Sequence, residues 1–188
     1  MDVLFTPSRE LLSAYLQALE QGWEPAITGP KRRGSHLEQA AQDPDAFLRG
    51  LTDLEGVGHV EQFDGTLRPR LPSRTFWIMD GDAFAGTLSL RWQPGSVELP
   101  NWVHGHVGWH VVPAHRGKGL APQALQACLP TARALGLPHL DLAILTNNTA
   151  SIRAAEKCGA VATGPTLPTP LIRSLHGWGG GGCQYDDP

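Results

Sequence analysis

The chain has 188 residues, of which 41% are hydrophobic and 18% charged, and its formal net charge is -3 at pH 7. This length and composition predict one folded domain with its own hydrophobic core, and they exclude a disordered chain. The mildly acidic balance argues against a dedicated nucleic-acid-binding protein, which usually carries a strongly basic face.

Signals for export, membrane insertion and metal binding are missing from the sequence. No basic segment followed by an apolar core opens the chain, and no apolar run approaches the length of a bilayer span. The three cysteines, Cys128, Cys158 and Cys183, lack CxxC or zinc-like spacing. No clustered-carboxylate pattern accompanies the eight histidines. We therefore expect a cytoplasmic protein that needs no metal and binds neither nucleic acid nor membrane.

The N-terminal residues predict an amphipathic helix. In "FTPSRELLSAYLQALEQGW", residues 5–23, four leucines and a tyrosine recur on one face at helical spacing. Thr6 is the expected N-cap, Pro7 suits the first helical position, and Gly22 is expected to end the helix.

Two further helix starts follow. "SHLE" at residues 35–38 has the capping-box pattern, and the pair Asp43-Pro44 begins the next helical segment. The basic run at residues 31–33 lies before both and is expected to be a solvated loop.

The middle of the chain predicts three strands. Residues 75–79 and 83–92 alternate around the turn "DGD" and form a hairpin, and residues 103–112 form the next strand, which ends at Pro113. A helix over residues 120–135, a strand over 139–145 and a helix over 148–159 complete the pattern. The strand–helix–strand order predicts that the strands around 107–112 and 140–145 are parallel neighbours, hence an α/β domain with a mixed sheet.

The segment "HRGKGLAPQAL", residues 115–125, joins a strand to a helix. Its glycines let backbone N–H groups approach a ligand closely, and a helix start carries a partial positive charge. The loop therefore predicts an anion cradle, most naturally for phosphate. It is not a P-loop, because GxxxxGK[ST] is absent, and it lacks the third glycine of a dinucleotide fingerprint.

The run from Arg116 to Ala121 has the pattern R-x-x-G-x-A and resembles the pyrophosphate loop [QR]-x-x-G-x-[GA] of the GNAT superfamily of N-acetyltransferases. The preceding "GHVGWHVVP" and the later Asn148-x-x-Ser151 before "EKCG" resemble further signatures of that family, over about residues 75–162. A bacterial group of acetyltransferases without assigned substrate is similar in its wider arrangement. The resemblance implies the GNAT fold, a mixed central sheet flanked by helices, with acetyl-CoA as the cofactor.

The resemblance also implies which residues bind coenzyme A. The strand before the loop would pair with the pantetheine arm, the loop would hold the pyrophosphate, and Asn148 would hydrogen-bond the arm. The implied residues are Trp109, His110, Val111, Val112, Arg116, Gly117, Lys118, Gly119, Leu120, Ala121, Asn148 and Ser151. A backbone N–H of Val111 or Val112 is expected to polarise the thioester carbonyl. Asn148 and Ser151 also suit the N-cap of their own helix, and both roles stay open.

Family members carry a general base on the strand before the loop. Here Gly105 occupies the comparable place, flanked by His104 and His106, and an imidazole is a side chain suited to accept a proton near neutral pH. His106 is preferred because it lies closer to the strand, with His110 and Glu98 as alternatives. A histidine without catalytic duty is an equally open interpretation.

The usual proton donor to the thiolate, a tyrosine in the last helix, is replaced by Ala155, and Tyr185 in the tail is no obvious substitute. We expect an N-acetyltransferase that moves an acetyl group directly to a primary amine of a small molecule or peptide, in a ternary complex. The alternative is a non-catalytic acyl-CoA-binding regulatory or interaction protein. One domain is expected over residues 1–188, with a loose glycine-rich tail from about 177. The segment "TGPTLPTP" is a poor strand, which is either irregular or completes its sheet through a partner subunit. Because dimers are common in the family that the chain resembles, a homodimer is a further expectation.

Overall fold

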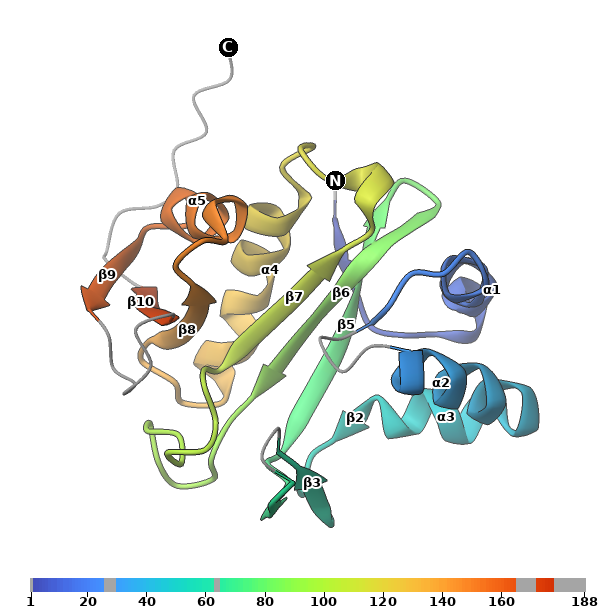
Figure 1. Ribbon diagram of the computed structural model, residues 1–188, viewed down its shortest axis with the longest axis horizontal. Coiled ribbons are helices and arrows are strands. Elements are labelled where there is room, and N and C mark those ends of the chain that lie inside the picture. Colours follow the sequence, from blue (N-terminus) through green and yellow to red (C-terminus); the bar gives the residue numbers. More distant parts are fainter. Residues whose placement is uncertain (1, 26–29, 63–64, 165–171, 178–188) are drawn as a thin grey trace.

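The computed structural model describes residues 2–25, 30–62, 65–164 and 172–177 (Figure 1). Its elements are, in chain order, β1 (Leu4–Phe5), α1 (Arg9–Glu20), α2 (Pro30–Gln42), α3 (Pro44–Gly50), β2 (Thr52–Asp53), β3 (His59–Glu61), β4 (Leu67–Pro69), β5 (Ser73–Asp80), β6 (Ala83–Arg91), β7 (Val107–Val111), the short 3-10 helix η1 (Pro113–His115), α4 (Leu120–Ala134), β8 (Leu140–Leu145), α5 (Thr149–Lys157), β9 (Ala160–Gly164) and β10 (Ile172–Gly177). None of the described helices is long and apolar enough to cross a membrane.

The predicted hairpin forms the centre of the main sheet. Strands β5 and β6 pair antiparallel around the expected turn, where Gly81 has a φ of 62°. The strand order is β1-β5-β6-β7, with β2 also paired to β5. All pairs in this sheet are antiparallel. Strand β5 is longer than the predicted 75–79, because its pairing extends into the polar residues at either end, whereas β6 ends at Arg91, one residue earlier than predicted.

The main sheet separates two hydrophobic cores. Phe76 and Ile78 pack on the side of α4 and α5, whereas Trp77 and Met79 pack on the side of α1, α2 and α3, as the period of two in a strand requires. Figure 1 shows the two groups of helices on either side of β5, β6 and β7. Tyr15 of α1 is almost fully buried and stacks on Trp77 at 4.8 Å between ring centroids. The apolar face predicted for the first helix is thus used for packing.

Two of the helix starts differ from their predictions. Helix α1 begins at Arg9 with Ser8 as the N-cap, so the expected roles of Thr6 and Pro7 are wrong. Helix α2 begins at Pro30, which places the "SHLE" pattern inside the helix and makes residues 31–33 helical in place of a loop. A proline preset for the first helical turn starts this helix earlier than the capping-box residues do.

The third helix start is confirmed. The Asp43 side chain accepts hydrogen bonds from the backbone N–H groups of Asp45 and Ala46, at 3.0 and 2.9 Å, at the start of α3. An aspartate N-cap satisfies donors that the first helical turn leaves free.

The second half of the chain forms a three-stranded antiparallel sheet, β8-β10-β9, covered by α4 and α5. The expected parallel pairing of β7 with β8 is not found among the described strands, because these two strands belong to different sheets. They meet only near their starts, where the His106 N–H donates to the Asp141 carbonyl at 2.8 Å. The α/β class is confirmed, but the described ladders are antiparallel and the sheet is not one continuous mixed sheet.

Gly105 allows this contact. Its φ is +144°, and a Cβ there would lie 2.9 Å from the Asp141 oxygen and 3.0 Å from the Ala143 nitrogen. Only a residue without a side chain permits so close an approach. The strand predicted from residue 103 consequently starts at Val107, after this sharp change of direction. Beyond the contact, the edge of β7 that does not face β6 has no strand partner in the described part of the chain.

Candidate functional site

The glycine loop after β7 presents backbone donors to open space. Gly117 and Gly119 have φ values of 82° and 73°, and Gly119 is the N-cap of α4 without a side-chain cap. Within the described residues, the backbone N–H groups of residues 117–121 donate to no protein acceptor. A Cβ on Gly117 would meet nothing within 4 Å. Free donors at a helix start, with open space in front, fit a pyrophosphate group.

Asp80 holds this loop to the β5–β6 turn. Its carboxylate accepts from the Lys118 Nζ at 2.7 Å and lies 2.8 Å from the His115 Nδ1. The hydrogen bonds from Lys118 and His115 lower the pKa of Asp80. The sequence pattern indicates only a turn residue at Asp80. No local pattern signals its contact with the loop, because the partners lie 38 and 35 residues away.

Strand β7 gives each of the expected arm-binding residues a different environment. The Val112 N–H donates to the Ala85 carbonyl at 2.8 Å, so it is already used in pairing with β6. Backbone groups alternate between the two edges of an antiparallel strand, and the N–H of Val111 therefore points to the unpaired edge. The Val111 carbonyl accepts from the Arg116 Nε at 3.1 Å. Of the two polarising donors expected, only the Val111 N–H is available.

Neighbouring side chains on β7 face opposite cores. Trp109 pairs with Leu88 and packs against the core beneath α4. His110 pairs with Thr87, which also pairs with Trp77, so His110 lies on the face covered by α1, α2 and α3. His110 is half-buried, and burial, followed by the charges of Arg116 and Arg32, lowers its pKa. A neutral imidazole at this position is able to accept a proton at neutral pH.

His106, the preferred base of the sequence analysis, is completely buried. Its Nδ1 accepts a hydrogen bond from the Asp141 N–H at 3.0 Å, so in the neutral ring the proton lies on Nε2. Nε2 is buried and has no hydrogen-bond partner among the described residues. Burial, the largest effect, lowers the pKa of His106, whereas Asp141 opposes this. In this arrangement the ring joins the starts of β7 and β8, and its basic nitrogen is already occupied.

The other proposed bases are less enclosed. His104 and Glu98 are exposed residues in the connection between β6 and β7, before the contact of β7 with β8. His106 and His110 are four residues apart, and on a helix this spacing would bring two histidines together as ligands of one metal ion. These two residues, however, do not lie on a helix. Extended backbone separates such residues by about 13 Å.

Helix α5 contributes the remaining expected residues. The Asn148 side chain accepts from the Ser151 N–H at 3.2 Å, which confirms the N-cap role. Within the described residues the amide nitrogen of Asn148 has no protein acceptor and stays free to bind a ligand. Ala155 is fully buried, and Cys158 donates from its Sγ to the Pro122 carbonyl at 3.2 Å. Ala155 has no proton to donate in place of the expected tyrosine, and Tyr185 lies outside the described residues.

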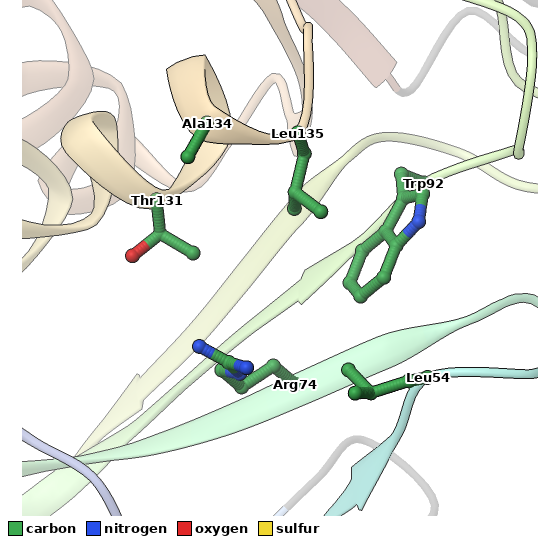
Figure 2. A pocket seen from close by; sticks show the side chains of 6 residues that line it. All are labelled: Leu54, Arg74, Trp92, Thr131, Ala134 and Leu135. Atoms are coloured by element: carbon green, nitrogen blue, oxygen red, sulfur yellow. The ribbon is translucent and has the colours of Figure 1, made fainter.

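A pocket of about 180 Å³ lies at the far end of α4 from the glycine loop (Figure 2). Its lining consists of Leu54, Arg74, Trp92, Thr131, Ala134 and Leu135. The residues on α4 belong to its last turns, whereas the anion cradle lies at its first turn. The pocket is thus separate from the cradle.

Comparisons with known proteins agree with this geometry. The family described as Acetyltransferase (GNAT) domain matches residues 36–161. No curated protein matches the sequence. Solved structures with a similar fold include a GnaT-family acetyltransferase from Bordetella pertussis, with a TM-score of 0.52, 16% identity and coverage of 92% of each chain.

Two other similar structures were solved with ligands bound. The ribosomal L7/L12 alpha-N-protein acetyltransferase RimL, in complex with coenzyme A, has a TM-score of 0.59 at 14% identity, covering 94% of each chain. The microcin C7 self-immunity acetyltransferase MccE, in complex with acetyl-CoA and AMP, has a TM-score of 0.56 at 13% identity, covering 94% of this chain and 92% of that one. At these identities the likeness concerns the fold. Because the family match spans more than half of the chain and includes the anion cradle, the chain belongs to the GNAT family and is an acetyl-CoA-dependent acetyltransferase.

Proposed function

We propose that the chain transfers an acetyl group directly from acetyl-CoA to a primary amine, with the amine bound on the face of the sheet covered by α1, α2 and α3. The observation that carries this proposal is the set of free backbone donors of residues 117–121 at the start of α4. These donors form an anion site. The nearby carboxylate of Asp80 does not compete with a bound anion for them, because it contacts Lys118 and His115.

The unpaired edge of β7 supports a binding path beside the cradle. The backbone of Trp109 and Val111 faces this edge and suits pairing with an extended, amide-containing arm. Asn148, at the start of α5, offers its free amide nitrogen as a further donor to the arm. Acetyl-CoA supplies the thioester whose carbonyl carbon the amine attacks and whose thiolate leaves. The Val111 N–H would donate to the carbonyl oxygen, where negative charge develops.

We assign the general base to His110. Its ring lies on the acceptor face, is half-buried, and has a lowered pKa, so it is neutral before the reaction and takes the proton that the attacking amine loses. His106 is assigned a positioning role, because its Nδ1 is held by the Asp141 N–H. The thiolate takes its proton from water, since Ala155 stands where a tyrosine would serve.

Calorimetric titration with acetyl-CoA tests the cradle. Gly119→Glu adds bulk and negative charge at the N-cap, so binding should be lost. Gly95→Glu is the matched control, because Gly95 has a similar φ of 74° in an open loop at the other end of β7. Equal effects of the two variants would show that the cradle does not bind the pyrophosphate.

Thiol release with a panel of primary amines tests the transfer step. Release that depends on an amine supports direct acetyl transfer. Binding of acetyl-CoA without release by any amine would support the alternative, a non-catalytic acyl-CoA-binding protein. A covalent acetyl-enzyme, detected by mass spectrometry after incubation without amine, would contradict direct transfer.

A further inference from the structure

The face of the sheet that carries His110 is polar at its β6 and β7 end. Pairing places Ser89 opposite Gly108, two residues from His110, and Arg91 follows Ser89 on the same face. Further along this face, toward the β5–β6 turn, the surface becomes the apolar core around Trp77. An acceptor approaching His110 therefore meets polar groups on one side and aromatic side chains on the other.

Arg91 lies directly over the glycine of β7. Its Nη2 would be 3.3 Å from a Cβ on Gly108, and it makes a long contact of 3.5 Å with the Ser89 Oγ. The missing side chain at Gly108 thus leaves room for the guanidinium above the strand. Arg91 is half-buried, and burial is the largest cause that lowers its pKa, followed by the charge of Arg32.

Arg32 belongs to α2, one of the helices that cover this face of the sheet. It lies in the first turn of α2, whose N-terminal end is directed toward the sheet (Figure 1). His36 follows Arg32 by one turn on the same side of α2, and its Nδ1 lies 2.6 Å from the Tyr15 hydroxyl. Tyr15 stacks on Trp77, so Arg32 lies on the side of α2 that covers this face of the sheet. The charge of Arg32 is also among the causes that lower the pKa values of His110 and Arg91. Arg32 is an exposed residue, so its guanidinium is accessible to a ligand from solvent.

No carboxylate balances these two charges in the described part of the chain. Neither Arg32 nor Arg91 has an aspartate or glutamate within 4.0 Å there, whereas Arg9, Arg33 and Arg70 each have one. A half-buried guanidinium such as that of Arg91 costs free energy in the unliganded protein when it lacks a counterion. A bound anion removes that cost, and the planar guanidinium suits carboxylate and phosphate oxygens.

We propose that Arg32 and Arg91 bind an oxyanion of the acceptor, so that the substrate is an amine that also bears a carboxylate or phosphate group. This inference rests on the acetyl transfer proposed above and names the class of acceptor. The arginines hold the acid group over Gly108 and Ser89, and the amine is directed toward His110. A polycationic acceptor such as spermidine is repelled from the same place.

Matched pairs of amines test the acceptor class. L-alanine is compared with L-alaninamide for the carboxylate, phosphoethanolamine with ethanolamine for the phosphate, and spermidine serves as the cationic amine. Initial rates of thiol release are corrected to the concentration of unprotonated amine. The wild type should prefer the anionic member of at least one pair by about tenfold or more, as expected for charge-assisted hydrogen bonds.

Variants assign the preference to the two arginines. Arg91→Gln and Arg32→Gln should each reduce it about tenfold or more, and Arg91→Lys should retain part of it. Arg33→Gln is the control on the same helix, because Arg33 is already 3.7 Å from Glu24. Its preference should equal that of the wild type. A preference for neutral or cationic members, or one that survives both glutamine variants, would overturn the inference and leave the acetyltransferase proposal intact.

Calorimetry on the CoA-bound protein decides the matter if no amine gives turnover. Binding of L-alanine or phosphoethanolamine, weakened in Arg91→Gln and Arg32→Gln but not in Arg33→Gln, would support the oxyanion site while acetyl transfer to amines fails. Absence of binding for both anionic amines would overturn the oxyanion site itself.

Discussion

Replacing His110 with glutamine removes the proposed base while keeping a polar side chain on β7. Because the pKa of His110 lies below the ordinary value of histidine, the ring is mostly unprotonated at pH 7. The wild-type enzyme therefore works close to its full base capacity at that pH. General-base catalysis contributes about 10²- to 10⁴-fold, which corresponds to about 3–5 kcal/mol in the activation barrier, and His110→Gln should lose a rate of this size.

The pH dependence separates a base from a merely structural residue. With saturating acetyl-CoA and a limiting primary amine, the amine must lose one proton, so the logarithm of the rate rises with a slope of one below the pKa of the amine. Below the pKa of His110 a second proton must be lost, and the slope becomes two. In His110→Gln the slope should stay at one throughout.

His106→Asn serves as the control, because the asparagine oxygen replaces Nδ1 as acceptor for the Asp141 N–H. It should retain the change of slope even if the rate falls. A change of slope that persists in His110→Gln, or one that disappears in His106→Asn, would refute the assignment of the base to His110.

Three further predictions concern the framework. Gly105→Ala should lower the free energy of unfolding in urea by about 2–5 kcal/mol, because its Cβ would lie 2.9 Å from a backbone oxygen of β8 at a φ of +144°. Gly95→Ala is the control, because a Cβ there is strained by the backbone but meets only open space. An equal loss of stability in Gly95→Ala would contradict the role of the close contact. Asp80→Asn loses the ion pairs with His115 and Lys118, so it should lower Tm by about 2–4 °C and weaken acetyl-CoA binding about two- to fivefold in calorimetry. These effects are small because the contacts are partly exposed. The same losses in Asp82→Asn, in the same turn, would show that the contacts with the loop do not matter. His36 has a pKa lowered to about 4, chiefly by burial, so the unfolded chain binds a proton between pH 6.5 and 4 that the folded chain does not. Stability should fall by about 3 kcal/mol as the pH drops through this range. An unchanged fall in His36→Gln, measured by urea unfolding, would assign it to another group.

The sequence by itself determined several local features of this protein, among them the anion cradle. The hairpin of β5 and β6, the N-cap of α3 and the glycine loop before α4 all depend on residues within a few positions of one another. Alternation, helix capping and glycine conformations are local properties, and they can therefore be predicted from the residues alone. The start of α2 was misplaced because two local signals, Pro30 and the "SHLE" pattern, competed within one segment.

Only the tertiary structure decided how these elements meet at the site. It placed the Asp141 N–H on the ring of His106 and Asp80 on Lys118, pairs that lie 35 and 38 residues apart in the chain. The environment of His110 likewise depends on which face of the sheet α2 covers. Contacts of this kind arise from the packing of whole layers, so no spacing along the sequence encodes them.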